Sequence, residues 1–443
     1  MNNPLAKNFG FLSLLKFTAP TIIMMVFMSM YCMVDGVFVS NFVGETALSS
    51  VNIVFPIQSI IIAIAIMFAT GGSAIIAKKM GEGKAEEAKA NFTQIVIVGT
   101  AIGFVVTLVG LTFIRPIIHV LGSTPVLDDY CLSYLRILLL FAPFSVLQML
   151  FQFFFITAGK PRLGLFGTIA GGVANVVLDF IFIVFCDMGI AGAAWGTVIG
   201  NCIPAVFGLI YFTYKRRGSL CFVKPSRDMR LLWHSCQNGS SEMVTNLANA
   251  VTTFLFNVVM IRHLGENGVS AITIVLYSQF LLTSVYLGFS SGVAPVISYH
   301  YGEQNHSQLK KIYKISLVFI LISSVLIFVL STTLSAYIVE IFVNLDSPVF
   351  PLAKHGFLLF SISYLFTGIN IYASALFTAF SNGKISAVIA FLRTFVFIVL
   401  TILLLPLLIG VDGVWLSVPI AELITLSVSI AFLLKFRHIY QYG

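Results

Sequence analysis

Long runs of apolar residues follow one another along the chain, and short turns rich in Gly and Pro separate them. The runs do not alternate as strands of a membrane barrel would, and each is long enough for a bilayer-spanning helix of ~20 residues. The pattern predicts an all-α polytopic membrane protein with about twelve transmembrane helices. The first half gives spans at about 14–40, 47–77, 91–114, 130–156, 163–186 and 192–214, and the second half at about 231–262, 269–299, 312–337, 351–380, 385–409 and 414–436.

The composition supports this prediction. The 443 residues are 58% hydrophobic and 9% charged, whereas ordinary globular domains carry roughly 25% charged residues. The six cysteines are scattered, without a Cys-x-x-Cys pair or a His at ligand spacing, which argues against a disulfide framework or a metal site. The N-terminal stretch lacks the cleavage site of a signal peptide, so we expect the first helix to stay in the protein.

The formal net charge of +8 indicates topology rather than a nucleic-acid partner. Basic residues gather in every second loop, as the positive-inside rule expects of cytoplasmic loops. We therefore expect a multi-pass protein of a bacterial inner or plasma membrane, with both termini in the cytoplasm and no nucleic acid bound. The residues that carry this pattern are Lys7, Lys16, Lys78, Lys79, Lys84, Lys89, Lys160, Arg162, Lys215, Arg216, Arg217, Lys224, Arg227, Arg230, Lys310, Lys311, Lys314, Lys384, Lys435 and Arg437.

An internal repeat relates the two halves of the chain. The stretch 43–82 aligns with 264–303 at a constant offset of 221, so that Gln58 meets Gln279 and Gly71 meets Gly292. Six spans per half is an even number, so the two copies enter the membrane in the same direction, as in transporters that handle substrate between two halves. We expect an N-terminal six-helix lobe at 1–214, a cytoplasmic inter-lobe loop at 215–230 and a C-terminal six-helix lobe at 231–443.

Four polar residues of the first lobe are predicted to meet at one depth. With a helical rise of ~1.5 Å per residue, Asp35 lies roughly 28 Å from the inner surface along the first helix, and Asp179 roughly 25 Å along the fifth. Asn175 shares a face with Asp179 at spacing i, i+4, and Thr197 enters from the outer end of the sixth helix. The predicted cation-coupling set is therefore Asp35, Asn175, Asp179 and Thr197.

The chemistry of this set suits either H⁺ or Na⁺. An ionisable group at membrane depth costs at least roughly 2.5–3.5 kcal/mol, so it is expected to have a partner and a function. Two neighbouring carboxylates favour reversible protonation, whereas Asp35, Asn175 and Asp179 also offer the oxygen ligands that suit Na⁺. The alternative for Asp35 is a structural carboxylate bonded to Ser or Thr. The repeat places Phe256 opposite Asp35 and Leu400 opposite Asp179, so the second lobe does not copy the site.

The second lobe carries its own polar residues. Glu242 lies roughly 18 Å into the seventh helix on a polar stripe with Asn246, and we expect this stripe to face a central cleft. Arg393 and Glu422 are expected to form a structural ion pair between adjacent helices. Methionines and aromatic residues facing the cleft would make an adaptable pocket. The further cleft candidates are Gln148, Gln152, Met28, Tyr31, Phe151, Asn52, Gln58, Gln279 and Asn370.

These features together resemble the multidrug and toxic compound extrusion (MATE) family, over essentially the whole chain. The resemblance rests on twelve spans in two parallel lobes, on Asp35, and on the Gly44…Ala47-Leu48…Pro56 run that opens the second helix. The first-lobe set, with Pro20 fifteen residues before Asp35, is similar to the cation site of the DinF/MepA-like branch. The resemblance implies a V-shaped antiporter that exports cationic, amphipathic drugs and whose first helix bends near Pro20.

Other branches of the family use acidic residues of the second lobe. Glu242 matches their seventh-helix Glu in position, but the tenth helix offers Asn370 and no acid.

The leading hypothesis is thus a secondary active multidrug exporter that works by alternating access. It would need no cofactor besides the coupling ion, H⁺ or Na⁺. Its expected partners are lipophilic cationic drugs and the lipid bilayer, and we expect a monomer. A flippase for lipid-linked precursors is the alternative within transport, and it would favour a cationic cavity. An intramembrane enzyme would need a clustered catalytic set, whereas the seven His are dispersed through loops and helix ends.

Overall fold

The computed structural model of the chain describes residues 3–38, 42–214 and 218–442. The side chains of residues 35–38, 45, 46 and 48 are not described, so the side chain of Asp35 lies outside the described part.

The helices of the first half lie close to the predicted spans. The fourth predicted span is divided into two helices near Phe141, and the fifth ends in a π-helix. Neither feature was predicted, and the short helix α4 was missed as well. The elements are η1 (Pro4–Ala6), α1 (Phe11–Phe38), α2 (Glu45–Gly81), α3 (Ala85–Thr112), α4 (Ile114–Val120), α5 (Asp128–Leu140), α6 (Ala142–Thr157), α7 (Pro161–Asp179), η3 (Phe180–Phe185) and α8 (Gly189–Tyr214).

The second half repeats this order. Its tenth predicted span is likewise divided, and a π-helix lies within the eleventh. The elements are α9 (Met229–Gly302), α10 (His306–Thr333), α11 (Ser335–Glu340), α12 (Val349–Ser361), α13 (Tyr364–Ala379), α14 (Gly383–Phe391), η4 (Leu392–Phe397), α15 (Ile398–Ile409) and α16 (Val411–Tyr440).

The described residues give twelve membrane spans. Nine helical segments are long and apolar enough to cross a membrane, and two pairs bent by 55° and 53° add two more spans. One of the nine, α9, consists of two helices that meet at Gly265, where φ is 63° and ψ is −152°. Counting α9 twice gives the predicted twelve, and the polytopic all-α fold is confirmed.

Positive φ values mark the same turns in both repeats. Gly44 has a φ of 107°, and its repeat mate Gly265 has 63°. Gly189 and Gly410, also 221 residues apart, have 54° and 64°. Residues other than glycine rarely adopt positive φ, because their Cβ atom clashes with the backbone there. Glycine at these positions therefore fixes where one span ends and the next begins. The backbone therefore supports the repeat that the sequence indicates.

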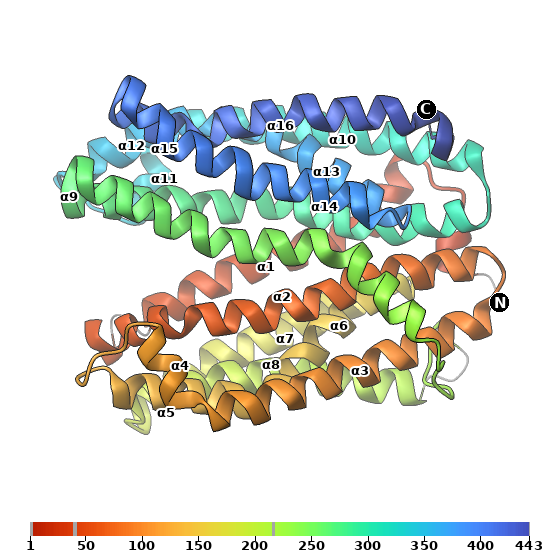
Figure 1. Cartoon of the computed structure of the whole chain (residues 1–443), viewed down its shortest axis with the longest axis horizontal. Helices are drawn as coiled ribbons and strands as arrows, with labels where there is room; N and C mark the ends of the chain where they lie inside the picture. The colour runs from red at the N-terminus through yellow and green to blue at the C-terminus, as the bar shows by residue number, and fades with distance from the viewer. Residues whose placement is uncertain (1–2, 39–41, 215–217, 443) are drawn as a thin grey trace.

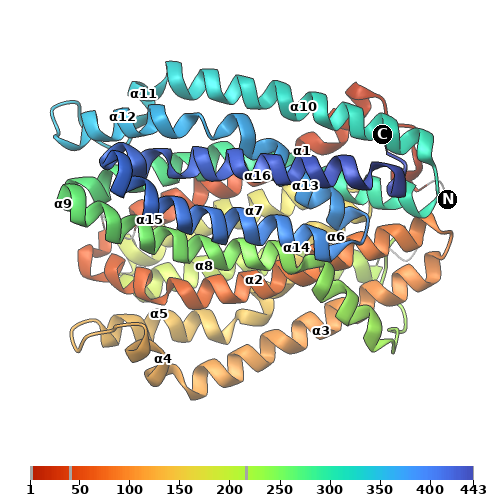
Figure 2. The same cartoon turned by 45° about the horizontal axis from the view of Figure 1, so that its top comes forward.

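The helices form two bundles that lie side by side along the long axis of the molecule. In Figure 1, α2–α8 make up the lower bundle and α10–α16 the upper one, and both ends of the chain lie at the right. The helices α1 and α9 contact each other, and α2 contacts α9, so these three join the bundles. Figure 2 shows the same long helices running nearly parallel to the long axis.

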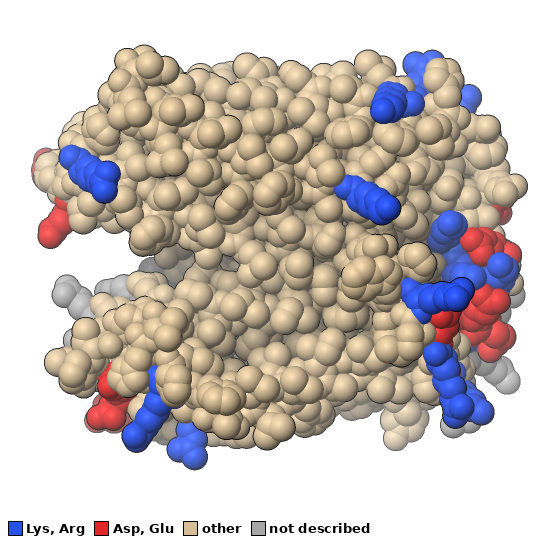
Figure 3. Space-filling model, in the orientation of Figure 1, with Lys and Arg blue, Asp and Glu red and all other residues tan. Residues whose placement is uncertain are grey.

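Charged side chains are distributed unevenly over this shape. In Figure 3, Lys, Arg, Asp and Glu gather at the end that carries the termini, which we call the basic end. The middle of this face is almost free of charge, and the opposite end is hollowed between the two bundles. A wide uncharged belt between polar ends is what a membrane-spanning protein requires.

The described part of the inter-lobe loop is packed against the first bundle. Phe222 stacks on Phe92 of α3 with ring centroids 5.1 Å apart. The main-chain nitrogen of Val223 donates to Thr93 Oγ1 at 3.1 Å, and that of Ser226 donates to the Ala90 oxygen at 3.2 Å. These contacts anchor the loop to α3 up to the start of α9 at Met229.

Glycine lets the bundles approach closely where α2 and α9 cross. A Cβ at Gly71 would collide with the main-chain oxygen of Ser235, and one at Gly239 with that of Met67. Small residues allow helices in a membrane to pack by van der Waals contact, where no hydrophobic driving force exists between them. The two bundles are therefore in backbone contact on the basic-end side of the hollow.

Candidate functional site

Asp179 is the last residue of α7, and its side chain is completely buried. It lies against α8 so closely that a Cβ at Gly196 would collide with its Oδ1. The structure thus brings the fifth and sixth spans together at Asp179, as the depth estimate predicted. Gly196 was missed, because a glycine offers no chemistry that sequence analysis would select.

Asn175 lies one turn below Asp179 and is also buried. Its Nδ2 donates to Thr197 Oγ1 at 3.4 Å. The Cβ of Asn175 lies 2.9 Å from where a Cβ would stand at Gly200. Gly192, Gly196 and Gly200 follow each other at a spacing of four, the small-xxx-small pattern of close helix contacts. That spacing was the available signal that α8 would face Asn175 and Asp179.

The backbone changes its winding directly after Asp179. The π-helix η3 begins at Phe180 and ends at Phe185. π-helical turns are rare and occur frequently at functional sites. The wider winding follows the buried carboxylate at once, so Asp179 marks the junction of two helix geometries within one membrane span.

Helix α1 packs along α7. A Cβ at Gly172 would stand 2.6 Å from the ring of Phe27 and 3.2 Å from that of Tyr31. About two turns earlier on α7, Gly164 lies near the sulfur of Met24. Glycines on α7 therefore make room for a row of large side chains on α1. The cation candidate Asp35 lies further along α1, and its side chain is outside the described residues.

Two of the predicted cleft residues, Gln152 and Met28, form a contact between α6 and α1. Gln152 Nε2 donates to the sulfur of Met28 at 3.2 Å. Gln148 lies one turn away on the same face of α6, and both amides are buried. Met28 is half-buried, as is Tyr31 one turn further on. The structure brings Gln152 and Met28 together, and Gln148 is buried one helix turn before Gln152.

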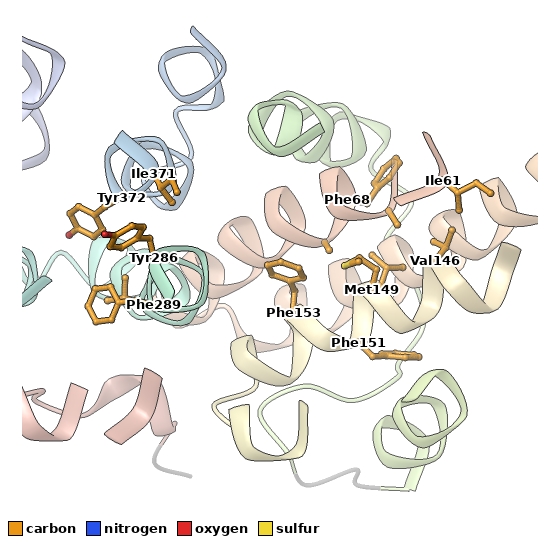
Figure 4. Close-up of a cluster of buried hydrophobic side chains, with 14 of the residues drawn as sticks. Ile61, Phe68, Val146, Met149, Phe151, Phe153, Tyr286, Phe289, Ile371 and Tyr372 are labelled. Carbon is orange, nitrogen blue, oxygen red and sulfur yellow. The ribbon is translucent and has the colours of Figure 1, made fainter. Parts of the chain in front are cut away.

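Phe151 is placed in the core of the first bundle instead of the cleft. Its ring stacks on Phe212 of α8 with centroids 5.6 Å apart, and only 1% of the residue is exposed. Figure 4 shows Phe151 on the opposite side of α6 from Met149 and Phe153. The expectation that Phe151 lines the cleft is therefore corrected. Neighbouring Phe residues on one helix point to different faces, and composition alone could not separate them.

Glu242 lies on α9 and lines a small cavity of about 10 Å³ together with Arg393, Thr245 and Ser374. That volume is of the order needed for one water molecule. Asn246 Nδ2 donates to the main-chain oxygen of Glu242, four residues earlier on α9, at 2.8 Å. The amide is therefore bonded to the backbone of its own helix. Glu242 and Asn246 are both half-buried. This is the burial expected of residues that pack against a neighbouring helix on one side and border a cleft on the other.

The predicted pair of Arg393 and Glu422 is present. Arg393 lies on the π-helix η4, and its Nε donates to Glu422 Oε1 at 2.8 Å. Asn370 Nδ2 donates to the other carboxylate oxygen, Oε2, at 2.7 Å. Ser429 Oγ in turn donates to Asn370 Oδ1 at 2.8 Å. The carboxylate is thus held from two helices.

Asn370 is consequently not a cleft residue in this structure. It is fully buried, and its amide is engaged on both sides, by Glu422 and Ser429. The sequence showed only a lone amide in the tenth span. The sequence did not show that the carboxylate of Glu422, on the last helix, would need a hydrogen-bond donor at that depth.

The remaining predictions concern scattered positions. Asn52 is exposed on α2, and the repeat mates Gln58 and Gln279 are half-buried on α2 and α9. Pro20 is buried, and α1 continues as one helix through it. Pro20 removes one backbone hydrogen bond, and that is the local weakness a hinge requires.

Comparison with known proteins decides the family. The sequence profile of the MatE family matches residues 20–181 and, a second time, residues 243–404. The chain belongs to the MatE family. The two matches, one in each half, also support the repeat. Its relatives include Multidrug export protein MepA of Staphylococcus saprophyticus, 24% identical over 97% of this chain and 95% of that protein. MepA of Staphylococcus aureus strain MRSA252 is 24% identical over 93% of this chain and 91% of that protein. These relatives of the MatE chain are named as export proteins, not as enzymes.

Solved structures share the fold of this MatE protein. One, described as the outward-facing conformation of a multidrug resistance MATE family transporter of the MOP superfamily, superposes with a TM-score of 0.92. It is 21% identical and covers 100% of this chain and 98% of that chain. MATE structures in the straight and bent conformations give TM-scores of 0.91 and 0.87 at 21% and 22% identity, each over 97% of this chain and over 96% and 95% of theirs.

Proposed function

We propose that this MatE protein is a secondary active multidrug exporter that exchanges H⁺ or Na⁺ for lipophilic cationic drugs. The observation that carries the proposal is the complete burial of Asp179 at the junction of α7, η3 and α8. A carboxylate at membrane depth is costly, and ionisable residues within membrane helices commonly mark ion or proton pathways. Asn175, one helix turn before Asp179, and Thr197, next to Gly196 in α8, add an amide and a hydroxyl that are hydrogen-bonded to each other. The relatives named as multidrug export proteins support the substrate class.

The packing of α1 on α7 supports Asp35 as the second carboxylate. Met24 lies near Gly164, and Phe27 and Tyr31 lie against Gly172, so the two helices keep one register. One further turn of α1 at ~1.5 Å per residue leads from Tyr31 to position 35, at the level of Asn175 and Asp179 on α7. Asp35, Asn175, Asp179 and Thr197 would then share the coupling ion in the first lobe.

Alternating access would use the two lobes, 1–214 and 231–443, as rigid halves. The hollow at the end away from the termini would be the drug cleft. In this proposal Glu242, Asn246 and Met28 would contribute to its walls. The basic end would face the cytoplasm of a bacterial cell, as the positive-inside rule favours. Movement of α1 near Pro20 would link ion binding at Asp35 to the shape of the cleft. One chain holds both lobes, so a monomer would suffice.

Transport in everted membrane vesicles tests the proposal. Accumulation of an ethidium-like dye is followed while an inside-acid gradient and an inside-Na⁺ gradient are imposed separately. We expect one gradient to drive accumulation in the wild type, and Asp179→Asn to abolish it at equal protein level. Asp346→Asn, which removes an exposed carboxylate outside the spans, is the matched control and should transport normally. Gradient-driven accumulation by Asp179→Asn at the wild-type rate would refute a coupling role for this carboxylate.

A further inference from the structure

A cavity of about 800 Å³ opens at the basic end, away from the proposed drug cleft. Its walls come from both lobes: the end of α2, the start of α3, the start of α9, and the turn between α13 and α14. Ligand pockets of proteins commonly have volumes of 300–1,000 Å³. The cavity is thus large enough for a small polar molecule or the headgroup of a lipid.

The cavity exists because α2 and the first half of α9, residues 229–264, diverge beyond their crossing. The helices are in backbone contact where Gly71 meets Ser235. Further toward the basic end, Lys78 of α2 and His234 of α9 line the cavity that opens between them. Any ligand that binds there touches both lobes. It would therefore hold them together at the end where this structure is closed.

The acidic groups of the lining already have partners. Glu87 Oε2 lies 2.8 Å from the ammonium of Lys79, and Glu82 lies 3.2 Å from that of Lys84. Asp228 caps α9, because its Oδ1 accepts from the main-chain nitrogen of Arg230 at 2.9 Å. These three carboxylates are thus engaged by Lys79, Lys84 and a helix terminus.

Two lysines of the lining remain available for an anion. Neither Lys78 nor Lys384 lies within ion-pair distance of a carboxylate among residues 3–38, 42–214 and 218–442. Lys78 belongs to the first lobe, and its ammonium lies 5.1 Å from the centre of the Tyr301 ring of the second. Lys384 belongs to the second lobe and stands in the first turn of α14. The free positive charge of the cavity therefore comes from both sides.

Helix ends and buried amides add to this preference. The N-termini of α9 and α14 border the cavity, and such ends carry partial positive charge and favour anions. The buried amides of Asn91 and Asn238 also line it. Asn238 Oδ1 is buried without a hydrogen-bond partner, although its Nδ2 donates to the Thr378 oxygen at 2.9 Å. The wall of the cavity thus carries polar groups in addition to the two lysines.

We propose that this cavity binds a phosphate-bearing anion through Lys78 and Lys384 and so stabilises the closed basic end. Basic pockets between membrane helices are known to take up anionic headgroups. A headgroup such as phosphatidylglycerol offers a phosphate and hydroxyl donors, and free phosphate offers the same charged group. The proposal is independent of the drug and of the coupling ion, because none of the cation-site residues lines the cavity.

The test follows the opening of the basic end directly. In a variant lacking the six native cysteines, Ser235→Cys places a thiol at the buried floor of the α2–α9 crossing. Labelling by an impermeant thiol reagent then reports separation of the lobes. The purified full chain is placed in phosphatidylcholine nanodiscs, with and without phosphatidylglycerol, and separately with added inorganic phosphate. Lys78→Gln with Lys384→Gln removes the two cations, and the exposed Lys310→Gln at the same end is the control.

We expect phosphate or phosphatidylglycerol to slow labelling in the parent protein and in the Lys310→Gln control. Each lysine lost should weaken binding of inorganic phosphate about tenfold by calorimetry, since a charged hydrogen bond contributes about that factor. Slowing by both ligands supports recognition of the phosphate group itself, and slowing by phosphatidylglycerol alone supports a lipid headgroup. The proposal is overturned if neither ligand slows labelling, or if the double variant responds like the parent. It is equally overturned if Lys310→Gln loses the response, because the effect is then one of general surface charge.

Discussion

Gly81 and Gly302 hold equivalent positions in the two repeats, and each packs against the main chain of the helix that carries the other. A Cβ at Gly81 would collide with the main-chain oxygen of Tyr299, and one at Gly302 with that of Lys78. The helix α2 and the second half of α9, residues 266–302, therefore touch through their backbones at the basic end. Two contacts related by the pseudo-symmetry of the fold close this end.

Replacing Gly302 by Ala should favour separation of the lobes at the basic end. The added methyl group would collide with backbone atoms, which cannot move aside by changing a side-chain rotamer. Overpacking of this kind destabilises the packed arrangement by about 1–3 kcal/mol. We expect labelling of Ser235→Cys to become about tenfold faster or more. Gly10→Ala is the matched control, because its Cβ would have no neighbour closer than 3.9 Å. Unchanged labelling in Gly302→Ala would show that the crossing tolerates a side chain.

The spans were predictable because the bilayer imposes a length on every apolar run. The turns between spans followed from Gly and Pro, and Gly44 and Gly265 do adopt positive φ. The divisions of two spans near Phe141 and Ile362 could not be predicted, since the apolar run continues through them. The π-helices η3 and η4 have no sequence signature either, because their extra residue is accommodated by packing.

The candidate site was predictable only where helix geometry fixes it. Asn175 and Asp179 had to share a face, and the contact of Asn175 with Thr197 follows from spans of known direction. The rotation of α6 about its axis was not determined by the sequence, so Phe151 was assigned to the wrong face. Likewise Asn370 depends on how α13 and α16 pack, which is a property of the assembled lobe.

Gly196→Ala should impair coupling without removing any polar group. Its methyl group would occupy the space of Asp179 Oδ1, so the carboxylate must turn away from α8. We expect gradient-driven dye accumulation to fall at least about tenfold, since a small displacement of a positioned group has effects of that size. Gly167→Ala on α7 is the control, because its Cβ would meet its nearest neighbour at an ordinary 3.4 Å. Normal transport by Gly196→Ala would place the carboxylate outside the coupling step.

Removing one partner of the Arg393–Glu422 pair should destabilise the second lobe more than removing both. Arg393→Met leaves the Glu422 carboxylate buried with only Asn370 as a donor, and an uncompensated buried charge costs about 3–5 kcal/mol. Arg393→Met combined with Glu422→Gln should recover much of that loss, as measured by thermal unfolding in detergent.

Arg262→Met serves as the control for this comparison, because Arg262 is exposed. It should unfold at the temperature of the parent protein. If Arg393→Met also unfolded there but failed to transport, the pair would have a functional rather than a structural role.

The affinity for a lipophilic cation should increase as the pH is raised. At low pH the membrane carboxylates bind protons and lose their charge, and as the pH rises they become anionic and attract the drug. A cation then gains in a weakly screened cavity, whereas an anion of equal size gains nothing and is desolvated. Under the proposed coupling, Asp35 and Asp179 would titrate as a pair, so no single residue would set the midpoint. Fluorescence titration of the purified protein with an ethidium-like dye, from acid to mildly alkaline pH, measures this affinity.

Two variants separate direct attraction of the drug from an effect through the coupling ion. Glu242→Gln should weaken binding at every pH if Glu242 attracts the drug directly. Asp179→Asn should mainly flatten the pH dependence if Asp179 acts through the coupling ion. Tighter binding at low pH, or equal affinity for an anionic dye of similar size, would contradict competition between cation and drug.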